Sequence, residues 1–247
     1  MSLVEESNDN PTDTISFKSN NSIFIWLDIL GFAEAVNDDK QHKILSDLLN
    51  KFQNLFFGSN FYKPTIISDG MVLYIEEPQK VKLKTVLKEI AEKQFNFILE
   101  NKFFIRGGIG VGTKYSEDEK QDKDVRNSMF VSNGLARSVK LESSFINWPV
   151  IGIDEANLFL IREIYGSNKE DEFFGLSRGY NQNGQSMFFI DFIEEKQEYF
   201  TLLQNKIHEF EKKENQHIRN KYIWLLRYYL YKYKDQVVNK SLEGIVL

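Results

Sequence analysis

Residues 22–28 read SIFIWLD, and residues 64–75 read PTIISDGMVLYI. The first stretch is a nearly continuous apolar run that ends at Asp28, a pattern typical of a buried central strand. The second holds two β-rich runs that meet at Asp69-Gly70, and an Asp-Gly pair between such runs is a strong hairpin signal. Together the two stretches predict three strands of one sheet.

Two helical patterns and a fourth strand extend this prediction. Apolar residues at helical spacing predict one helix between residues 44 and 55 and another over Val81–Leu99. Phe103–Val111 (FFIRGGIGV) predicts a strand whose glycines indicate that another part of the molecule approaches its backbone closely. The order strand, helix, strand, strand, helix, strand is that of ferredoxin-like and palm domains. The sequence therefore predicts an α+β fold built on a βαββαβ sheet.

Composition sets limits on the function. The net charge of −5 argues against a general nucleic-acid binder, which normally has a basic surface. The chain has no cysteine, which excludes disulfides and thiolate chemistry, and its three histidines are scattered. No signal peptide is evident, and no apolar run approaches the roughly 18 residues that a membrane span needs. We therefore expect a cytoplasmic protein without a membrane or nucleic-acid partner.

The chain divides into three predicted parts. Residues 1–20 are polar and aperiodic, so they predict a disordered tail. Residues 21–193 hold the sheet and the site, including a helix predicted over Phe130–Ser143. Residues 194–247 form a C-terminal helical extension, and one of its segments (KYIWLLRYYLYKY) is apolar over most of its circumference.

The predicted topology brings two acids together. In a βαββαβ sheet the first and third strands are adjacent and antiparallel, so Asp28 and Asp69 should share one edge. Two close carboxylates repel each other unless a proton or a cation lies between them. Oxygen ligands suit Mg²⁺ or Mn²⁺, and a pair of such ions serves phosphoryl transfer. The alternative is structural: Asp28 caps the next helix and Asp69 serves the turn.

The residues around this pair resemble the motifs of class III nucleotide cyclases. Asp28–Phe32 (DILGF) resembles the Asp-Ile-x-Gly-Phe signature, and Ile67–Gly70 (ISDG) resembles the Ile-Gly-Asp hairpin. Ile105–Gly110 (IRGGIG) resembles the Arg-x-Gly-Ile-x-x-Gly strand of that family. Ser132–Glu142 (SNGLARSVKLE) resembles the helix that carries an Asn and an Arg before Leu-Glu. The resemblance covers roughly residues 22–153.

Within that family the chain is most similar to the compact bacterial pyrimidine cyclases of the Pycsar antiphage systems. The similarity rests on Leu141-Glu142, on the Pro149-Val-Ile strand that follows, and on Lys221–Leu225 (KYIWL). It implies a homodimer with two Mn²⁺ or Mg²⁺ ions per site. It implies conversion of UTP, in preference to CTP, to a 3′,5′-cyclic monophosphate and pyrophosphate. It also implies a separate effector that the cyclic nucleotide activates.

The resemblance assigns roles to individual residues. The metal ligands would be Asp28, Asp69 and the carbonyl of Ile29. Thr65 stands where purine cyclases carry a Lys or Glu that reads the base, which favours a non-purine substrate. The nucleotide would be bound by Ile29, Gly31, Phe32, Thr65 and Asn133.

The predicted helix can be aligned with the family motif in two registers, and each places a different cation at the phosphate-binding position. Alignment on Leu-Glu puts Ala136 and Lys140 where the family has Asn and Arg, whereas a shift of three residues puts Asn133 and Arg137 there. Positions 133, 137 and 140 fall on one helical stripe, so Arg137 or Lys140 would contact the triphosphate. The alternative is a solvated basic face.

Other functions remain compatible with the same residues. They are an adenylate or guanylate cyclase, a palm-type nucleotidyl transferase or dinucleotide cyclase, and a non-catalytic nucleotide-binding module. Arg106, which lies in the glycine-rich strand, is expected to reach a carboxylate or to close the dimer, and the alternative is a purely structural ion pair.

Overall fold

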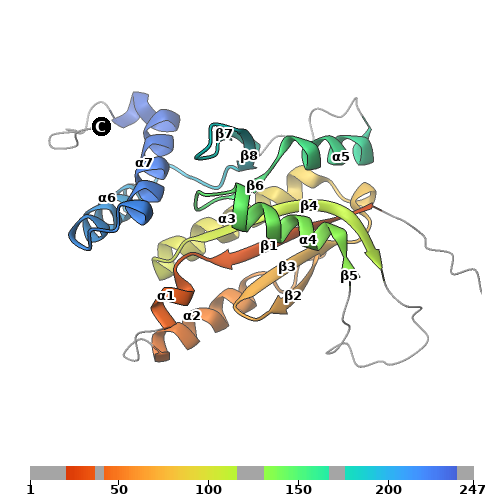
Figure 1. Cartoon of the computed structure of the whole chain (residues 1–247), viewed down its shortest axis with the longest axis horizontal. Coiled ribbons are helices and arrows are strands. Elements are labelled where there is room, and N and C mark those ends of the chain that lie inside the picture. The colour runs from red at the N-terminus through yellow and green to blue at the C-terminus, as the bar shows by residue number, and fades with distance from the viewer. Residues whose placement is uncertain (1–20, 37–41, 116–130, 167–175, 238–247) are drawn as a thin grey trace, which may run out of the picture.

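The computed structural model describes residues 21–36, 42–115, 131–166 and 176–237. The predicted tail over residues 1–20 lies outside this range. The first part of the chain folds as β1 (Asn21–Ile29), α1 (Phe32–Val36), α2 (His42–Leu55), β2 (Lys63–Ile67), β3 (Gly70–Ile75), a 3₁₀ turn (Pro78–Lys80), α3 (Leu83–Asn101) and β4 (Ile105–Tyr115). These strands lie in the order β2-β3-β1-β4, and β1 pairs antiparallel with both β3 and β4 (Figure 1). The predicted α+β fold with a βαββαβ sheet is confirmed.

The second part of the chain extends this sheet beyond β4. Its elements are β5 (Val131–Ser132), α4 (Asn133–Lys140), a π-helical turn (Leu141–Phe145), β6 (Ile151–Ile153), α5 (Glu155–Tyr165), β7 (Leu176–Tyr180) and β8 (Ser186–Ile190). The sheet continues β4-β6-β8-β7, and β5 pairs with the end of β4. The helix predicted over Phe130–Ser143 is shorter in the structure, because α4 begins at Asn133 and gives way to the π-helical turn at Leu141.

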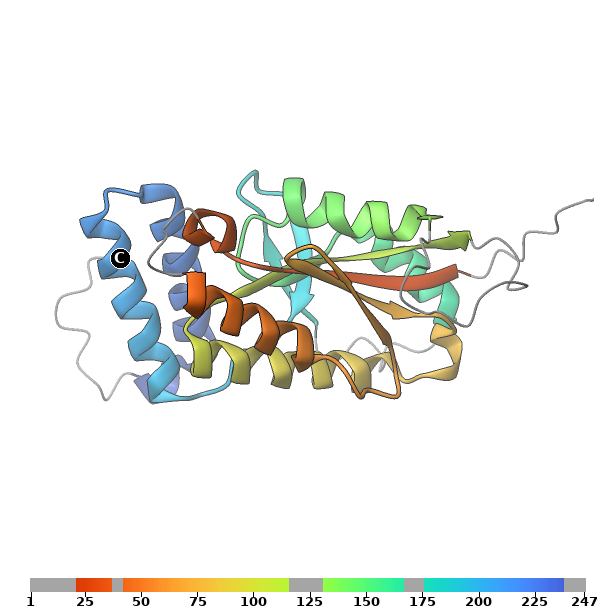
Figure 2. The ribbon, with the colours of Figure 1, turned by 90° about the horizontal axis from the view of Figure 1, so that it is seen from below.

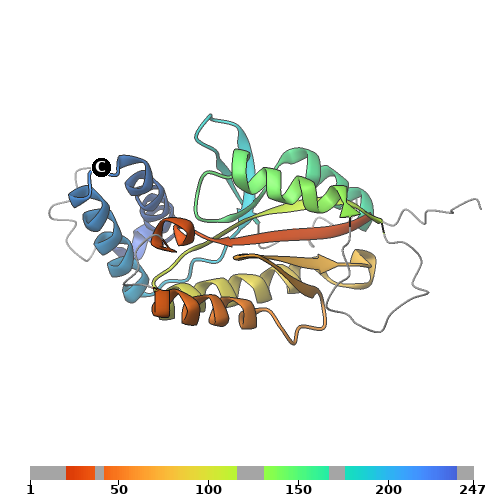
Figure 3. The ribbon, with the colours of Figure 1, turned by 60° about the horizontal axis from the view of Figure 1, so that its bottom comes forward.

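The two faces of the sheet are covered differently. One face carries Ile23, Ile25 and Leu27 of β1 and packs against α2, α3 and α5 in the main core. The other face is covered by α4, so that the sheet lies between α4 and the α2–α3 layer (Figures 2 and 3). The helix sits directly on the glycines of β4: a Cβ added at Gly110 would lie 2.7 Å from the Ser138 nitrogen. The close approach predicted from these glycines is confirmed.

The last two helices, α6 (Gln197–Lys212) and α7 (Gln216–Val237), pack as a pair. They lie beyond the end of the sheet toward which β1 runs (Figures 1 to 3). A second core joins them to the sheet: the ring centroid of Phe104, the residue before β4, lies 5.0 Å from that of Tyr222 in α7. Among the described helices, none has both the length and the apolar character that a membrane crossing requires.

Candidate functional site

The ends of β1 and β3 place Asp28 and Asp69 at one rim of the sheet. Leu27 pairs with Met71, and Asp28 itself pairs with Arg106 on the other neighbour, β4. Asp69 directly precedes β3, the strand beside β1. Its carboxylate is close enough to Asp28 to raise the pKa of Asp28. The adjacency that the topology predicts is therefore present.

The hairpin that carries Asp69 differs by one residue from the prediction. Ile67 pairs with Gly70, so the two turn residues are Ser68 and Asp69 rather than Asp69 and Gly70. Ser68 supplies the positive backbone angle that the turn needs, with φ of 59°. Gly70 lies in β3 and is required for another reason: a Cβ there would collide with the Trp26 indole. The Asp-Gly signal locates the hairpin, but Gly70 serves the packing of Trp26 and is not one of the two turn residues.

Arg106 connects Asp28 to a second carboxylate, Glu142. The Arg106 Nε and Nη2 donate hydrogen bonds of 3.1 and 3.0 Å to Oδ2 of Asp28. The same Nε lies 2.6 Å from Oε1 of Glu142, in the π-helical turn. The exposed fractions of the side chains are 19% for Asp28, 28% for Arg106 and 6% for Glu142. Of the two roles expected for Arg106, the structure supports contact with a carboxylate.

Burial and charge oppose each other at this cluster. Burial raises the pKa of Asp28, the Arg106 guanidinium lowers it, and the Asp69 carboxylate raises it further, so that the pKa lies above the ordinary value. Burial also raises the pKa of Glu142, against the lowering effects of Arg106 and of Lys221 in α7. Lys221 is itself only 9% exposed. Sequence reasoning found Glu142 and Lys221 only as parts of motifs and assigned neither to the site.

The donor set at this rim fits a hard divalent ion. Both hydrogen bonds from Arg106 go to one oxygen of Asp28, Oδ2. No group of three or more His, Cys, Asp or Glu side chains is placed to hold a metal within the described residues. The protein ligands would therefore be limited to the two carboxylates of Asp28 and Asp69. Mg²⁺ commonly takes one or two carboxylates and completes its coordination with water and phosphate oxygens.

The predicted phosphate-binding turn follows Asp28 directly. Gly31, the residue before α1, has a φ of 80°, and its carbonyl accepts a hydrogen bond of 3.1 Å from the backbone of Ala35 within α1. Ile29 and Phe32 are buried in the main core and hold the turn against the sheet. Thr65 lies farther along β2, where it pairs with Val72 and is half-buried.

Asn133 and Arg137 of α4 lie along β4, away from Asp28. Asn133 accepts a hydrogen bond of 2.8 Å from the backbone of Thr113, and Arg137 donates one of 2.7 Å to the carbonyl of Val111. Thr113 is seven residues from Arg106, which is about 23 Å along a strand. Within one chain the structure therefore does not bring Asn133 to Asp28. Lys140, at the opposite end of α4, is exposed and lies two residues from Glu142.

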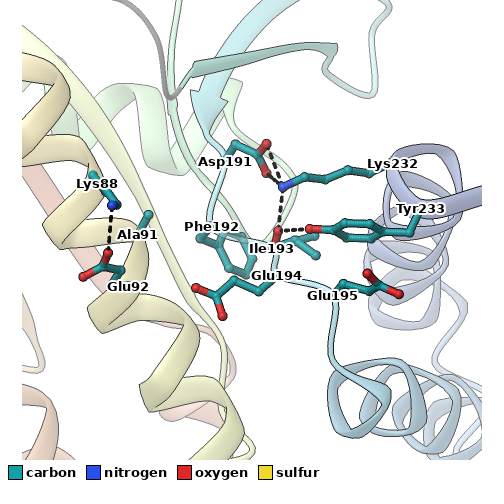
Figure 4. A pocket seen from close by; sticks show the side chains of 10 residues that line it. All are labelled: Lys88, Ala91, Glu92, Asp191, Phe192, Ile193, Glu194, Glu195, Lys232 and Tyr233. Carbon is teal, nitrogen blue, oxygen red and sulfur yellow. Dashed lines mark hydrogen bonds and ion pairs between the residues drawn. The ribbon is translucent and has the colours of Figure 1, made fainter. Parts of the chain in front are cut away.

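A separate pocket of about 370 Å³ lies where α3 faces α7 (Figure 4). Lys232 of α7 forms an ion pair of 2.9 Å with Asp191, and both Lys232 and Tyr233 donate hydrogen bonds to the carbonyl of Ile193. None of the site residues predicted from the sequence lines this pocket. The pocket is lined by Lys88, Ala91, Glu92, Asp191, Phe192, Ile193, Glu194, Glu195, Lys232 and Tyr233.

No protein-family profile and no curated protein matches this sequence. One similar solved structure is the adenylyl cyclase CyaB from P. aeruginosa, with 15% identity and a TM-score of 0.44, over 73% of this chain and 97% of that chain. Another is a bacterial light-regulated adenylyl cyclase, with 11% identity and a TM-score of 0.41, over 81% of this chain and 58% of that chain. The α+β assignment rests on the strand order and helix layers described above.

Proposed function

We propose that the chain is a nucleotide cyclase that converts UTP, or CTP, into a 3′,5′-cyclic monophosphate and pyrophosphate. The observation that carries the proposal is the half-buried carboxylate pair Asp28 and Asp69 on neighbouring strand ends. The cyclase-like sequence around both residues supports the reaction type. Thr65, in the position that reads a purine in related cyclases, supports the pyrimidine base.

In this proposal Asp28, Asp69 and the carbonyl of Ile29 hold two Mn²⁺ or Mg²⁺ ions. Such ions, when bound, favour ionisation of the ribose 3′-hydroxyl and offset charge on the triphosphate. The bond between the 3′-oxygen and the α-phosphorus forms, the bond between the α-phosphorus and pyrophosphate breaks, and the hydroxyl proton passes to water. The backbone at Gly31 and Phe32 orients the phosphates, and positioning accounts for much of the rate in this class of reaction.

We further propose that two copies of the chain complete each site. Asn133 lies about 23 Å along β4 from the level of Asp28, so a single chain cannot apply both to one nucleotide. A twofold axis that places two sheets face to face brings α4 of one copy to the aspartates of the other. The exposed apolar side chains Ile67 and Val139, on the face of the sheet that carries α4, support such a contact.

The decisive experiment is incubation of the purified protein with each of the four ribonucleoside triphosphates and Mn²⁺, followed by chromatography. We expect cyclic UMP or cyclic CMP. We also expect no product from Asp28→Asn or Asp69→Asn variants that keep the wild-type circular dichroism spectrum. Best turnover of ATP or GTP would indicate a purine cyclase, a linear or dinucleotide product a nucleotidyl transferase, and no product from any substrate a non-catalytic module.

The biological role that we propose is signalling in antiphage defence. The cyclic nucleotide would activate a separate effector protein that harms the infected cell. Expression of the chain together with such an effector should reduce phage yield, and the Asp69→Asn variant should not.

A further inference from the structure

Two carboxylates compete for one hydrogen of Arg106. The Nε atom has a single N–H, and in the structure this N–H donates to Asp28 at 3.1 Å. Glu142 Oε1 lies closer to the same nitrogen, at 2.6 Å, yet within the described residues it has no aligned hydrogen bond. The contact is an ion pair with a buried oxygen on which the hydrogen is not well aligned, so it gains less than a fully formed, charge-assisted hydrogen bond would. Glu142 is therefore poised to accept the Nε hydrogen of Arg106.

A divalent ion at Asp28 would change the outcome of this competition. The ion would place two positive charges beside the Arg106 guanidinium, and like charges at this range repel strongly in a half-buried site. An ion pair between Arg106 and a carboxylate that does not hold the ion would then be more favourable than the ion pair with Asp28. Glu142 already lies within contact distance, so the N–H can turn toward it without a large movement of the side chain.

Lys221 brings α7 into the same cluster. Its side chain is largely buried, and its charge lies close enough to Glu142 to lower the pKa of that carboxyl, against the larger raising effect of burial. A second cation near Glu142 partly neutralises the carboxylate and so reduces its attraction for Arg106. Removal of Lys221 should therefore favour the Arg106–Glu142 contact.

We propose that Glu142, which already contacts Arg106, becomes its main partner when Asp28 binds a divalent cation, and that Lys221 of α7 limits how strongly it holds Arg106. The inference rests on the metal role given to Asp28 in the proposed function. Glu142 and Lys221 are positioning residues, since both act through Arg106.

The test measures Mn²⁺ affinity of the full-length protein by the electron paramagnetic resonance signal of free Mn²⁺, without nucleotide. Glu142→Gln keeps the shape of the side chain but removes its negative charge, so Asp28 becomes the only carboxylate that attracts Arg106 here and we expect Mn²⁺ to bind about tenfold more weakly. Lys221→Met should bind Mn²⁺ more tightly than the wild type, and Lys221→Arg should keep the wild-type affinity. In the Glu142→Gln background Lys221→Met should have little effect, because Lys221 acts through Glu142.

Lys232→Met is the matched control, because Lys232 lies in α7 as Lys221 does, but its charge is paired with Asp191 at the separate pocket. It should leave Mn²⁺ affinity unchanged, and thermal denaturation should show that every variant folds. If Asp28→Asn binds Mn²⁺ as well as the wild type, the proposed metal site is wrong and this inference falls with it. If Asp28→Asn loses Mn²⁺ while Glu142→Gln does not weaken binding, only the inference is overturned.

Discussion

Asp28 has a raised pKa because burial and the Asp69 charge together outweigh the attraction of Arg106. The folded chain therefore holds the Asp28 proton over a pH range in which the unfolded chain, with an ordinary value of 3.8, has already released it. The stability that this group contributes is present below the unfolded pKa and is lost as the pH rises through the folded pKa. A cation that binds the ionised carboxylate removes this cost, as expected of a site that is completed by a metal.

Measurements on Asp28→Asn over a range of pH test the direction of this pKa shift and of its effect on stability. Asparagine does not ionise, so the variant should gain thermal stability relative to the wild type as the pH rises from about 4 to about 7. The measurement is the difference in melting temperature between the two proteins in the presence of a metal chelator. A difference that stays constant over this range would show that Asp28 keeps its ordinary pKa in the folded state.

The sequence predicts the position of Asp28 and Asp69 because each ends or begins a strand whose partner the topology specifies. The Arg106 cluster could not be predicted in the same way. Arg106 and Asp28 are 78 residues apart and meet only through the register of β1 with β4. A single arginine in an otherwise apolar, glycine-rich strand is a signal that a buried acid lies nearby, but it does not say which acid. Glu142 reaches Arg106 through a π-helical turn that no sequence pattern predicted.

At the scale of elements, the fit of α4 on β4 determines where Glu142 and Arg137 lie. Ser132 caps the helix, since its Oγ accepts hydrogen bonds from the backbone of Gly134 and Leu135 at 3.1 and 3.2 Å. The π-helical turn then adds one residue to the last turn, with Ile146 donating to the carbonyl of Leu141. The glycines of β4 predicted this close packing, whereas β7 was not predicted because its sequence LSRGY lacks an apolar alternation.

Gly110→Ala should disturb this fit. The new Cβ would meet backbone atoms of α4, including the Ser138 nitrogen at 2.7 Å, and backbone cannot move aside as a flexible side chain can. We expect a loss of about 1–3 kcal/mol in the free energy of unfolding, measured by urea denaturation. Ala136→Ser, at an exposed position of the same helix, is the control and should change stability by less than about 0.5 kcal/mol. Wild-type stability of Gly110→Ala would mean that α4 lies farther from β4 than described.

For the whole molecule, the division into residues 21–193 and 194–247 stays a prediction, and the packing argues against independence of the two parts. Tyr199 of α6 is fully buried, with its ring 5.4 Å from that of Phe95 in α3. Tyr222 and Leu225 of α7 belong to the same core as Phe104. The second core is therefore shared between the sheet and the two helices.

A chain that ends at Ile193 should fail to fold cooperatively, because removal of α6 and α7 exposes this aromatic core to water. The readouts are the sharpness of thermal denaturation and the binding of a dye that reports exposed apolar surface. A chain that ends at Val237 keeps both helices and is the control. A cooperative transition in the shorter chain would show that residues 21–193 are an autonomous domain.

Two copies that share each site should complement one another when each carries a different defect. Asp28→Asn damages the aspartate side of a site and Arg137→Ala the α4 side, so we expect each variant alone to be inactive. In a mixed dimer one site receives both defects and the other receives neither, so random mixing should restore about one quarter of wild-type turnover. Asp28→Asn mixed with Asp69→Asn is the matched control: both defects lie on the aspartate side, every site keeps one of them, and no activity should return. If the first mixture also stays inactive, each chain builds its site alone. That result would contradict the argument from the distance along β4 between Asn133 and the level of Asp28.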